Sequence, residues 1–138
     1  MIVFGQPNVG EDEIQSVVET LRSGWIGTGP RVKEFQDQFA DYVGGRFAIA
    51  TSSCTAALHL CMTASGIGPG DEVITTPMTF CATANAILHT GARPVFADCD
   101  RRTLNIRAEA IEEKITSRTR AIIPVHMHGR PCDMVRIR

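Results

Sequence analysis

The residues best suited to chemistry follow the first short apolar run of the chain. That run, Phe47-Ala48-Ile49-Ala50, leads into Thr51-Ser52-Ser53-Cys54-Thr55 and then into a stretch compatible with a helix. In an open α/β sheet, ligands bind outside the carboxyl ends of the strands, where such turns lie. Small hydroxyl residues there leave backbone N–H groups at the positive end of a helix, an arrangement that binds phosphate. The serines could instead act only as helix N-caps, and spacing alone favours this second interpretation.

Cys54 is a candidate nucleophile, because it lies at the predicted start of that helix and helix N-termini favour the thiolate form. A nucleophilic thiol also needs a neighbouring base. His59 lies on the next turn, and its spacing does not place it beside the sulfur. The sequence therefore does not favour a catalytic thiol.

A second group of reactive side chains follows the last apolar run. His126 and His128 lie on one face of an extended segment, and Cys132 follows them. A structural zinc site needs a fourth ligand and tighter spacing, so ordinary polar or phosphate contacts are the better interpretation and we predict no metal. The chain has no P-loop, no GxGxxG and no GxSxG, which argues against nucleotide hydrolysis and α/β-hydrolase chemistry.

The elements that position these residues are predicted to alternate between strands and helices along the chain. Short apolar runs recur about every 25 residues and alternate with segments of helical pattern, which is typical of a parallel sheet. We predict an α/β fold with a mostly parallel sheet of about four strands flanked by helices. The predicted strands are 47–50, 72–75, 94–97 and 121–125, and the predicted helices between them are 55–64, 80–89 and 107–115.

Residues 1–45 are predicted to form a separate N-terminal helical segment. One helix begins at the acidic run Glu11-Asp12-Glu13, which suits a helix N-terminus, and ends at Gly24. A second begins at Pro30 and ends at Gly44-Gly45. Between them lies a glycine-rich loop that contains Trp25 and Thr28.

The amino-acid composition argues against nucleic-acid-binding and membrane proteins. The 138 residues carry a formal net charge of −1, with 43% hydrophobic and 21% charged residues, which favours a globular protein that does not bind nucleic acid. Five cysteines without a CxxC pair indicate a reduced, cytoplasmic chain. No window is apolar enough to predict insertion into a membrane.

Five segments follow one another with the order and spacing of one enzyme family. Together they resemble the DegT/DnrJ/StrS family of pyridoxal-phosphate-dependent sugar aminotransferases, and they span essentially this whole chain but only the N-terminal third of a family member. The segments are Ser23-Gly24-Trp25-Ile26-Gly27-Thr28-Gly29-Pro30, Ser52-Ser53-Cys54-Thr55-Ala56-Ala57-Leu58-His59-Leu60, Gly68-Pro69-Gly70-Asp71-Glu72-Val73-Ile74, Thr79-Phe80-Cys81-Ala82-Thr83-Ala84-Asn85-Ala86 and Ala121-Ile122-Ile123-Pro124-Val125-His126.

The resemblance implies the N-terminal portion of a fold-type I large domain and assigns roles by position. The turn Ser53-Cys54-Thr55 resembles the family's phosphate cradle, which reverses the preference for a simple N-cap. Phe80 matches the aromatic residue that stacks on the pyridine ring, although a core phenylalanine would have the same pattern. Trp25 and Thr28 match a loop near the family's active-site mouth, on the substrate side.

The resemblance also implies that two functional residues are absent. The family's aspartate for the pyridine nitrogen and its Schiff-base lysine would follow residue 138, and Lys33 and Lys114 match neither motif. Residues 46–138 would thus be a partial cofactor-binding domain, and we predict no catalytic residue in this chain and weak or no cofactor binding by it alone.

Complete relatives would transfer an amino group from glutamate to a nucleotide-linked keto sugar, as homodimers, in cell-envelope or antibiotic sugar biosynthesis. The competing hypothesis is a non-catalytic α/β phosphate-binding or interaction module, in which the same turn holds some other phosphate or no ligand.

Overall fold

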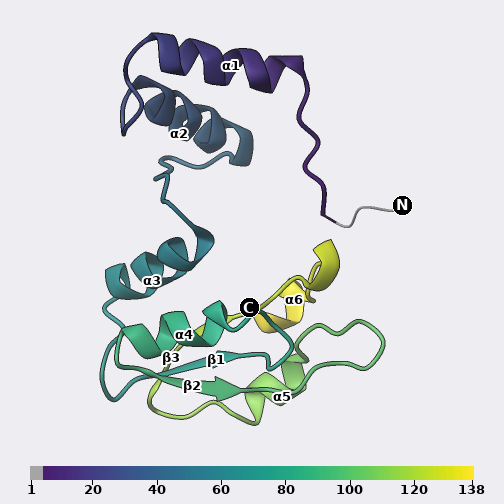
Figure 1. Ribbon diagram of the computed structural model, residues 1–138. Helices are drawn as coiled ribbons and strands as arrows, with labels where there is room; N and C mark the ends of the chain where they lie inside the picture. The colour runs from purple at the N-terminus through teal and green to yellow at the C-terminus, as the bar shows by residue number, and fades with distance from the viewer. Residues whose placement is uncertain (1–4) are drawn as a thin grey trace. The chain divides into compact units, whose positions relative to one another are not determined.

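The computed structural model describes residues 5–138 and divides the chain into two compact units, Met1–Ala50 and Thr51–Arg138 (Figure 1). In the first unit, helix α1 (Glu11–Arg22) begins with three acidic residues and ends at Arg22, with Ser23 as its C-cap just before Gly24. The Gly10 N–H donates to Glu13 Oε2 at 2.7 Å, which satisfies one N–H at the start of the helix. Helix α2 (Pro30–Val43) begins at Pro30 and ends at Gly44, whose φ of 65° is in the left-handed region.

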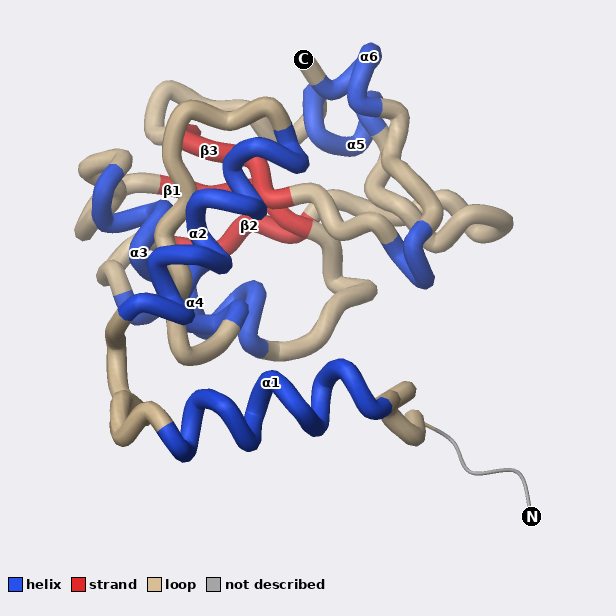
Figure 2. The backbone as a smooth tube through the Cα atoms, turned by 90° about the horizontal axis from the view of Figure 1, so that it is seen from above, coloured by secondary structure: helices blue, strands red, loops and turns tan. Residues whose placement is uncertain are grey.

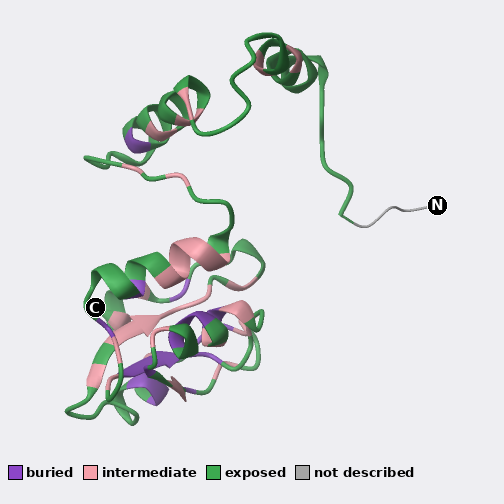
Figure 3. Cartoon of the chain, turned by 60° about the vertical axis from the view of Figure 1, so that its left-hand side comes forward, coloured by how far each residue is buried: buried purple, intermediate pink, exposed green. Residues whose placement is uncertain are grey.

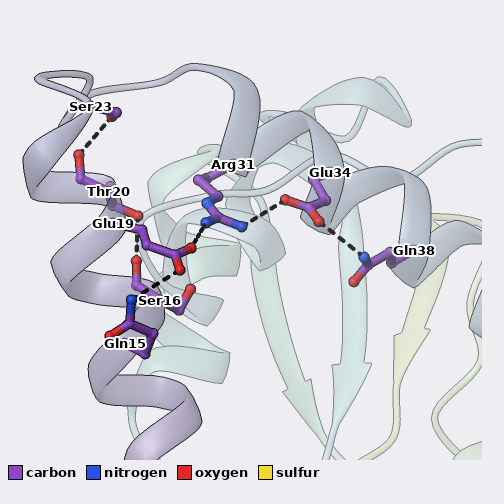
Figure 4. Close-up of polar contacts among 8 residues, drawn as sticks. All are labelled: Gln15, Ser16, Glu19, Thr20, Ser23, Arg31, Glu34 and Gln38. Atoms are coloured by element: carbon purple, nitrogen blue, oxygen red, sulfur yellow. Dashed lines mark hydrogen bonds and ion pairs between the residues drawn. The ribbon is translucent and has the colours of Figure 1, made fainter.

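Polar contacts connect the two helices of the first unit. Arg31, at the start of α2, reaches Glu19 of α1 at 2.8 Å and Glu34 of its own helix at 3.2 Å (Figure 4). All three side chains are about half exposed, so each ion pair contributes little to stability. Among residues 5–50 the structure buries only Ala40 (Figure 3). The apolar side chains of this unit are therefore largely exposed.

The second unit is built on a parallel sheet of three strands, β1 (Glu72–Thr75), β2 (Arg93–Phe96) and β3 (Thr119–Ile123), in the order β2-β1-β3 (Figure 2). β1 is central, and its residue Ile74 pairs with Val95 and Ile122. All four β1 residues are buried, as expected for a parallel strand covered on both faces.

Helices cover both faces of this sheet. On one face, Val73 packs in a cluster with residues of α3 (Cys54–Ala64) and α4 (Ala82–His89). On the other face, Ile74 packs in a cluster with α5 (Ala108–Glu112), to which residues of α6 (Met134–Ile137) add. Figure 1 shows α4 and α5 on opposite sides of the strands. The α/β class and the parallel sheet flanked by helices are thus confirmed.

The predicted strand 47–50 is wrong. These residues form no strand in the structure, and Phe47 and Ile49 are 80% and 81% exposed. A strand forms only when a neighbour takes its backbone hydrogen bonds, and the three strands of the second unit pair with one another. The Ala50 N–H instead donates to Gln36 Oε1 of α2 at 2.9 Å. The described chain therefore has three strands where the apolar runs predicted four.

A buried carboxylate joins the amino ends of the three strands. Glu72 of β1 is 1% exposed, and its oxygens accept from Thr116 Oγ1 at 2.7 Å, from Arg93 at 2.6 Å and from Arg118 at 2.6 Å. The Thr116 hydroxyl and then the two guanidinium groups lower the pKa of Glu72 to about 2. Because Arg93 begins β2 and Arg118 precedes β3, this one side chain fixes the register at that edge.

No helix among residues 5–138 is both long enough and apolar enough to cross a bilayer.

Candidate functional site

The candidate site lies at the carboxyl ends of the three strands. Because the strands are parallel, the segments that follow Thr75, Phe96 and Ile123 leave from one edge of the sheet. The Thr75 hydroxyl donates to the Ile123 carbonyl at 2.9 Å and ties the ends of β1 and β3 together. Side chains in the segment after β1 and in the segment after β3 are therefore presented from neighbouring strands.

Ser53 is the N-cap of α3 in the structure. Its backbone is extended, and its Oγ accepts the Ala56 N–H at 3.2 Å. The Thr51 hydroxyl donates to the Ser53 carbonyl at 2.9 Å and fixes the turn from the other side. Ser53 and Cys54 are exposed and Thr55 is half-buried. The two interpretations of this turn are compatible, because a capped helix still presents its remaining first N–H groups to a ligand.

Phe80 lies just before α4 and is 78% exposed, so it is not a core residue. Polar contacts order the segment that carries it. The Met78 N–H donates to Thr76 Oγ1 at 3.2 Å, and the Thr79 and Thr83 hydroxyls are 2.7 Å apart. An aromatic ring on an ordered segment at the carboxyl edge can stack on a flat ligand.

The turn at Ser53 and Phe80 are presented by two helices that pack against each other. The rings of His59 on α3 and His89 on α4 meet edge to face with centroids 5.9 Å apart. In Figure 1 both helices lie on the same face of the sheet and start toward the end at which the strand arrows point. The second unit thus places both predicted cofactor contacts on one side of the sheet, at its carboxyl edge.

Trp25 and Thr28 lie in the first unit and contact each other. The Trp25 indole N–H donates to the Thr28 carbonyl at 2.9 Å. The indole lies so close to Gly29 that a Cβ at that position would overlap it. Trp25 is 58% exposed and lines a hollow of about 600 Å³ between the end of α1 and the start of α2. The loop is thus an ordered structure with an accessible aromatic face.

The two histidines after β3 do not lie on one face of an extended segment, because β3 ends at Ile123 and His128 lies in a short 3₁₀ turn. His126 Nδ1 accepts the Cys132 N–H at 3.0 Å, so that nitrogen is already used by the backbone. Cys132 is buried, its Sγ donates to the Val125 carbonyl at 3.2 Å, and burial raises the pKa of its thiol. His128 is exposed, with a φ of 51°. Among residues 5–138 no group of three or more His, Cys, Asp or Glu side chains could hold a metal ion.

Asn105 is a residue of this edge that sequence reasoning missed. It is 5% exposed, and its amide accepts the Met127 N–H at 2.9 Å and donates to the Arg130 and Pro131 carbonyls at 3.0 Å each. Asn105, which lies in the segment after β2, therefore holds the segment after β3 in place. An asparagine in a loop predicts only a turn, so its sequence position carried no signal for this role.

Comparison with known proteins gives a consistent result. The model of the DegT/DnrJ/EryC1/StrS aminotransferase family matches residues 7–138. A spore coat polysaccharide biosynthesis protein of Bacillus subtilis, SpsC, is 56% identical over 131 residues, which are 95% of this chain and 34% of that protein.

Solved structures show the same similarity. Spr1654 of Streptococcus pneumoniae, provisionally named a sugar aminotransferase and solved in its PMP form, has 42% identity and a TM-score of 0.94 over 99% of this chain and 34% of its own. An aminotransferase from Psychrobacter cryohalolentis has 39% identity and a TM-score of 0.90 over 95% of this chain and 34% of its own. The chain therefore spans about a third of the length of the relatives it matches.

Proposed function

Because the chain belongs to the DegT/DnrJ/EryC1/StrS aminotransferase family, we propose that it supplies the phosphate-binding and ring-stacking part of a pyridoxal-phosphate-dependent sugar aminotransferase. The observation that carries this proposal is the exposed Phe80 on an ordered segment at the same sheet edge as the open N-terminus of α3. An exposed aromatic ring on an ordered segment can stack on a flat cofactor, which supports this assignment.

The residues of the second unit fit this cofactor. At the phosphate end, the backbone N–H groups at Ser53, Cys54 and Thr55 and the Thr55 hydroxyl would donate to the anionic oxygens. At the ring end, Phe80 would stack on the pyridine face and orient it. Pyridoxal phosphate, when bound, supplies the electron sink that allows an amino group to move between two carbon centres.

This chain binds and orients, and we assign it no proton-transfer residue. Neither of its two lysines is a candidate: Lys33 pairs with Asp37 within α2 at 2.8 Å, and Lys114 follows α5, which packs on the sheet face opposite α3 and α4. In a complete enzyme of this family, the Schiff-base lysine and the aspartate for the ring nitrogen would come from the two thirds of the length that this chain does not span. We accordingly take residues 46–138 as part of the cofactor domain and residues 1–45 as a separate helical segment.

The proposed reaction moves an amino group from glutamate to the ketone of a nucleotide-linked sugar. The name of the Bacillus subtilis relative, which refers to spore coat polysaccharide biosynthesis, supports a sugar substrate. Trp25 and Thr28 are the substrate-side residues in this proposal, since aromatic faces pack well on sugar rings and the Trp25 indole is held with one face accessible. We also propose a homodimer in the cytoplasm, where exposed thiols such as those of Cys54, Cys61 and Cys81 stay reduced.

Pyridoxamine phosphate is the appropriate probe, because it carries the phosphate and the ring but no aldehyde that could react with lysines. We expect it to bind weakly to the 138-residue chain, since one helix N-terminus contributes only about 0.3–2 kcal/mol toward an anion. Thr55→Ala and Phe80→Ala should each weaken binding. The matched controls, Thr63→Ala near the other end of α3 and Phe35→Ala on α2, should leave it unchanged.

If binding is indifferent to Thr55→Ala and Phe80→Ala, the cofactor proposal is wrong. Phosphate binding that depends on Thr55 but not on Phe80 would instead favour a general phosphate-binding module. Loss of binding only when His126 and His128 are both replaced would move the anion site to the segment after β3.

A further inference from the structure

The segment that follows β3 is closed on itself by side-chain contacts. Asn105 holds it at Met127, Arg130 and Pro131, and the Cys132 N–H closes it onto His126 Nδ1. The short 3₁₀ helix η1 (Met127–Gly129) lies between these contacts. A segment of seven residues with this many internal contacts is preformed before any ligand arrives.

These contacts also set which nitrogen of His126 carries the proton. Nδ1 accepts a backbone N–H at 3.0 Å, so it must present a lone pair. In the neutral ring the proton is then on Nε2, which becomes a hydrogen-bond donor. Among residues 5–138, Nε2 makes no hydrogen bond to a protein group, and His126 is exposed. The structure thus holds the Nε2 donor of His126 in a fixed orientation, while only Nδ1 takes part in a hydrogen bond with the described residues.

His126 is also placed at the correct edge of the sheet. It lies three residues after Ile123, the end of β3, and the Ile123 carbonyl accepts from Thr75 at the end of β1. The segment of β1 continues through Thr76 to Phe80. His126 therefore leaves the sheet beside the strand whose continuation carries the stacking residue.

We propose that the Nε2–H of His126 donates a hydrogen bond to an oxygen of the ligand bound at this edge, with Asn105 and the Cys132 N–H as the groups that position it. This inference rests on the proposed cofactor function and adds a ligand-contacting residue after β3 to those on α3 and before α4. The acceptor chemistry is that of a phosphate oxygen or a ring hydroxyl oxygen.

Two substitutions separate the donor from the positioning contact. The substitution His126→Asn retains an acceptor near the Nδ1 position for the Cys132 N–H but removes the donor at Nε2. The substitution His126→Gln does the reverse: it places an amide nitrogen near the Nε2 position and loses the acceptor for the Cys132 N–H. We expect His126→Asn to keep the fold and weaken pyridoxamine phosphate about tenfold, which corresponds to ~1.4 kcal/mol. His126→Gln should retain more affinity than His126→Asn, and His89→Asn, an exposed histidine on α4, is the control.

Nitrogen NMR of the histidine rings can distinguish a ligand contact from a purely structural role. If His126 only supported the fold, its ring resonances would not change when ligand is added. We expect His126 in the free chain to show a protonated Nε2 and an unprotonated Nδ1, and its Nε2 resonance to shift on titration with the ligand. Comparison of pyridoxamine phosphate, inorganic phosphate and pyridoxamine identifies the acceptor: a shift with phosphate alone assigns a phosphate oxygen, and a shift with pyridoxamine alone assigns the ring oxygen.

The inference and the proposed function fail in distinguishable ways. If pyridoxamine phosphate shifts the amides of Ser53–Thr55 but leaves His126 Nε2 unchanged, the inference is overturned and the cofactor site stands. A protonated Nδ1 in the free chain, or His126→Asn with unchanged affinity, also overturns it. If neither Ser53–Thr55 nor His126 responds to any of the three compounds, the proposed function fails first.

Discussion

At the scale of single residues, the exposure of a side chain distinguishes a core residue from a surface residue, which its sequence pattern could not do. A core phenylalanine and a cofactor-stacking phenylalanine have the same sequence pattern. The 78% exposure of Phe80 excludes the core alternative, and the stacking role stays a prediction. Ser53 was predictable as an N-cap from its type and place, and the structure shows that cap. Asn105 was not predictable, because its three hydrogen bonds join segments more than 20 residues apart in sequence.

The lysines give the first residue-scale prediction. Mixing the chain with pyridoxal phosphate and reducing with borohydride should give no stoichiometric adduct at one lysine, because Lys33 and Lys114 are exposed residues, Lys33 is paired with Asp37, and neither belongs to the proposed cofactor contacts. Peptide mapping by mass spectrometry checks this. Low, random labelling of both lysines agrees with it, whereas complete modification of a single lysine contradicts it.

Gly29 gives the second residue-scale prediction. Gly29→Ala should displace the Trp25 indole from the Thr28 carbonyl, because the added Cβ would overlap the ring. Trp25 is the one tryptophan of the sequence, so its fluorescence emission reports the change directly. Gly27→Ala is the matched control, since a Cβ there would meet no atom within 4 Å. Identical spectra for the Gly29 variant and the parent would disprove this account of the loop.

At the scale of elements, hydrophobic periodicity and turn residues located most helices and strands. Helix α2 ends at the predicted Gly44, α1 ends shortly before the predicted Gly24, and β1 occupies the predicted residues. The pattern failed at Phe47–Ala50, since pairing depends on a neighbouring strand and an apolar run cannot show whether one exists.

Glu72 gives a prediction at this scale, because its carboxylate joins three strands. A pKa held near 2 in the folded state, below the usual value of about 4.3, means that Glu72 stabilises the fold above the unfolded pKa and loses this contribution as the pH falls toward 2. Glu72→Gln should therefore lower the free energy of unfolding at pH 7 and flatten its decline between pH 5 and pH 2. Urea unfolding across that range, with the exposed Glu112→Gln as control, measures both. A Glu72→Gln variant as stable as the parent at pH 7 would refute this role.

At the scale of the whole molecule, many large apolar side chains of the described chain are exposed. The first unit buries only Ala40 among its described residues, and its exposed apolar side chains include Val17, Leu21, Phe35 and Phe47. The amount of exposed surface could not be predicted from composition, since a hydrophobic content of 43% is ordinary for a globular protein.

We therefore expect the 138-residue chain to self-associate or to be poorly soluble when expressed alone, with Phe47–Ala50 as a principal contact because it combines exposed apolar side chains with an extended segment that pairs with no strand of the described residues. The double substitution Phe47→Ser and Ile49→Ser should reduce the association, whereas Val135→Ser, at another exposed apolar position, should not. Sedimentation velocity distinguishes these outcomes. A monodisperse parent chain with a cooperative thermal transition at ordinary mesophilic temperature would contradict the expectation.

The measurement that tests the central claim most directly is an amide and aromatic NMR titration of the chain with pyridoxamine phosphate. The account predicts that the largest shifts fall on the amides of Ser53, Cys54 and Thr55 and on the ring of Phe80, and that inorganic phosphate shifts the three amides without the ring. Largest shifts elsewhere on the chain, or no shift at these four residues up to millimolar ligand, would contradict it.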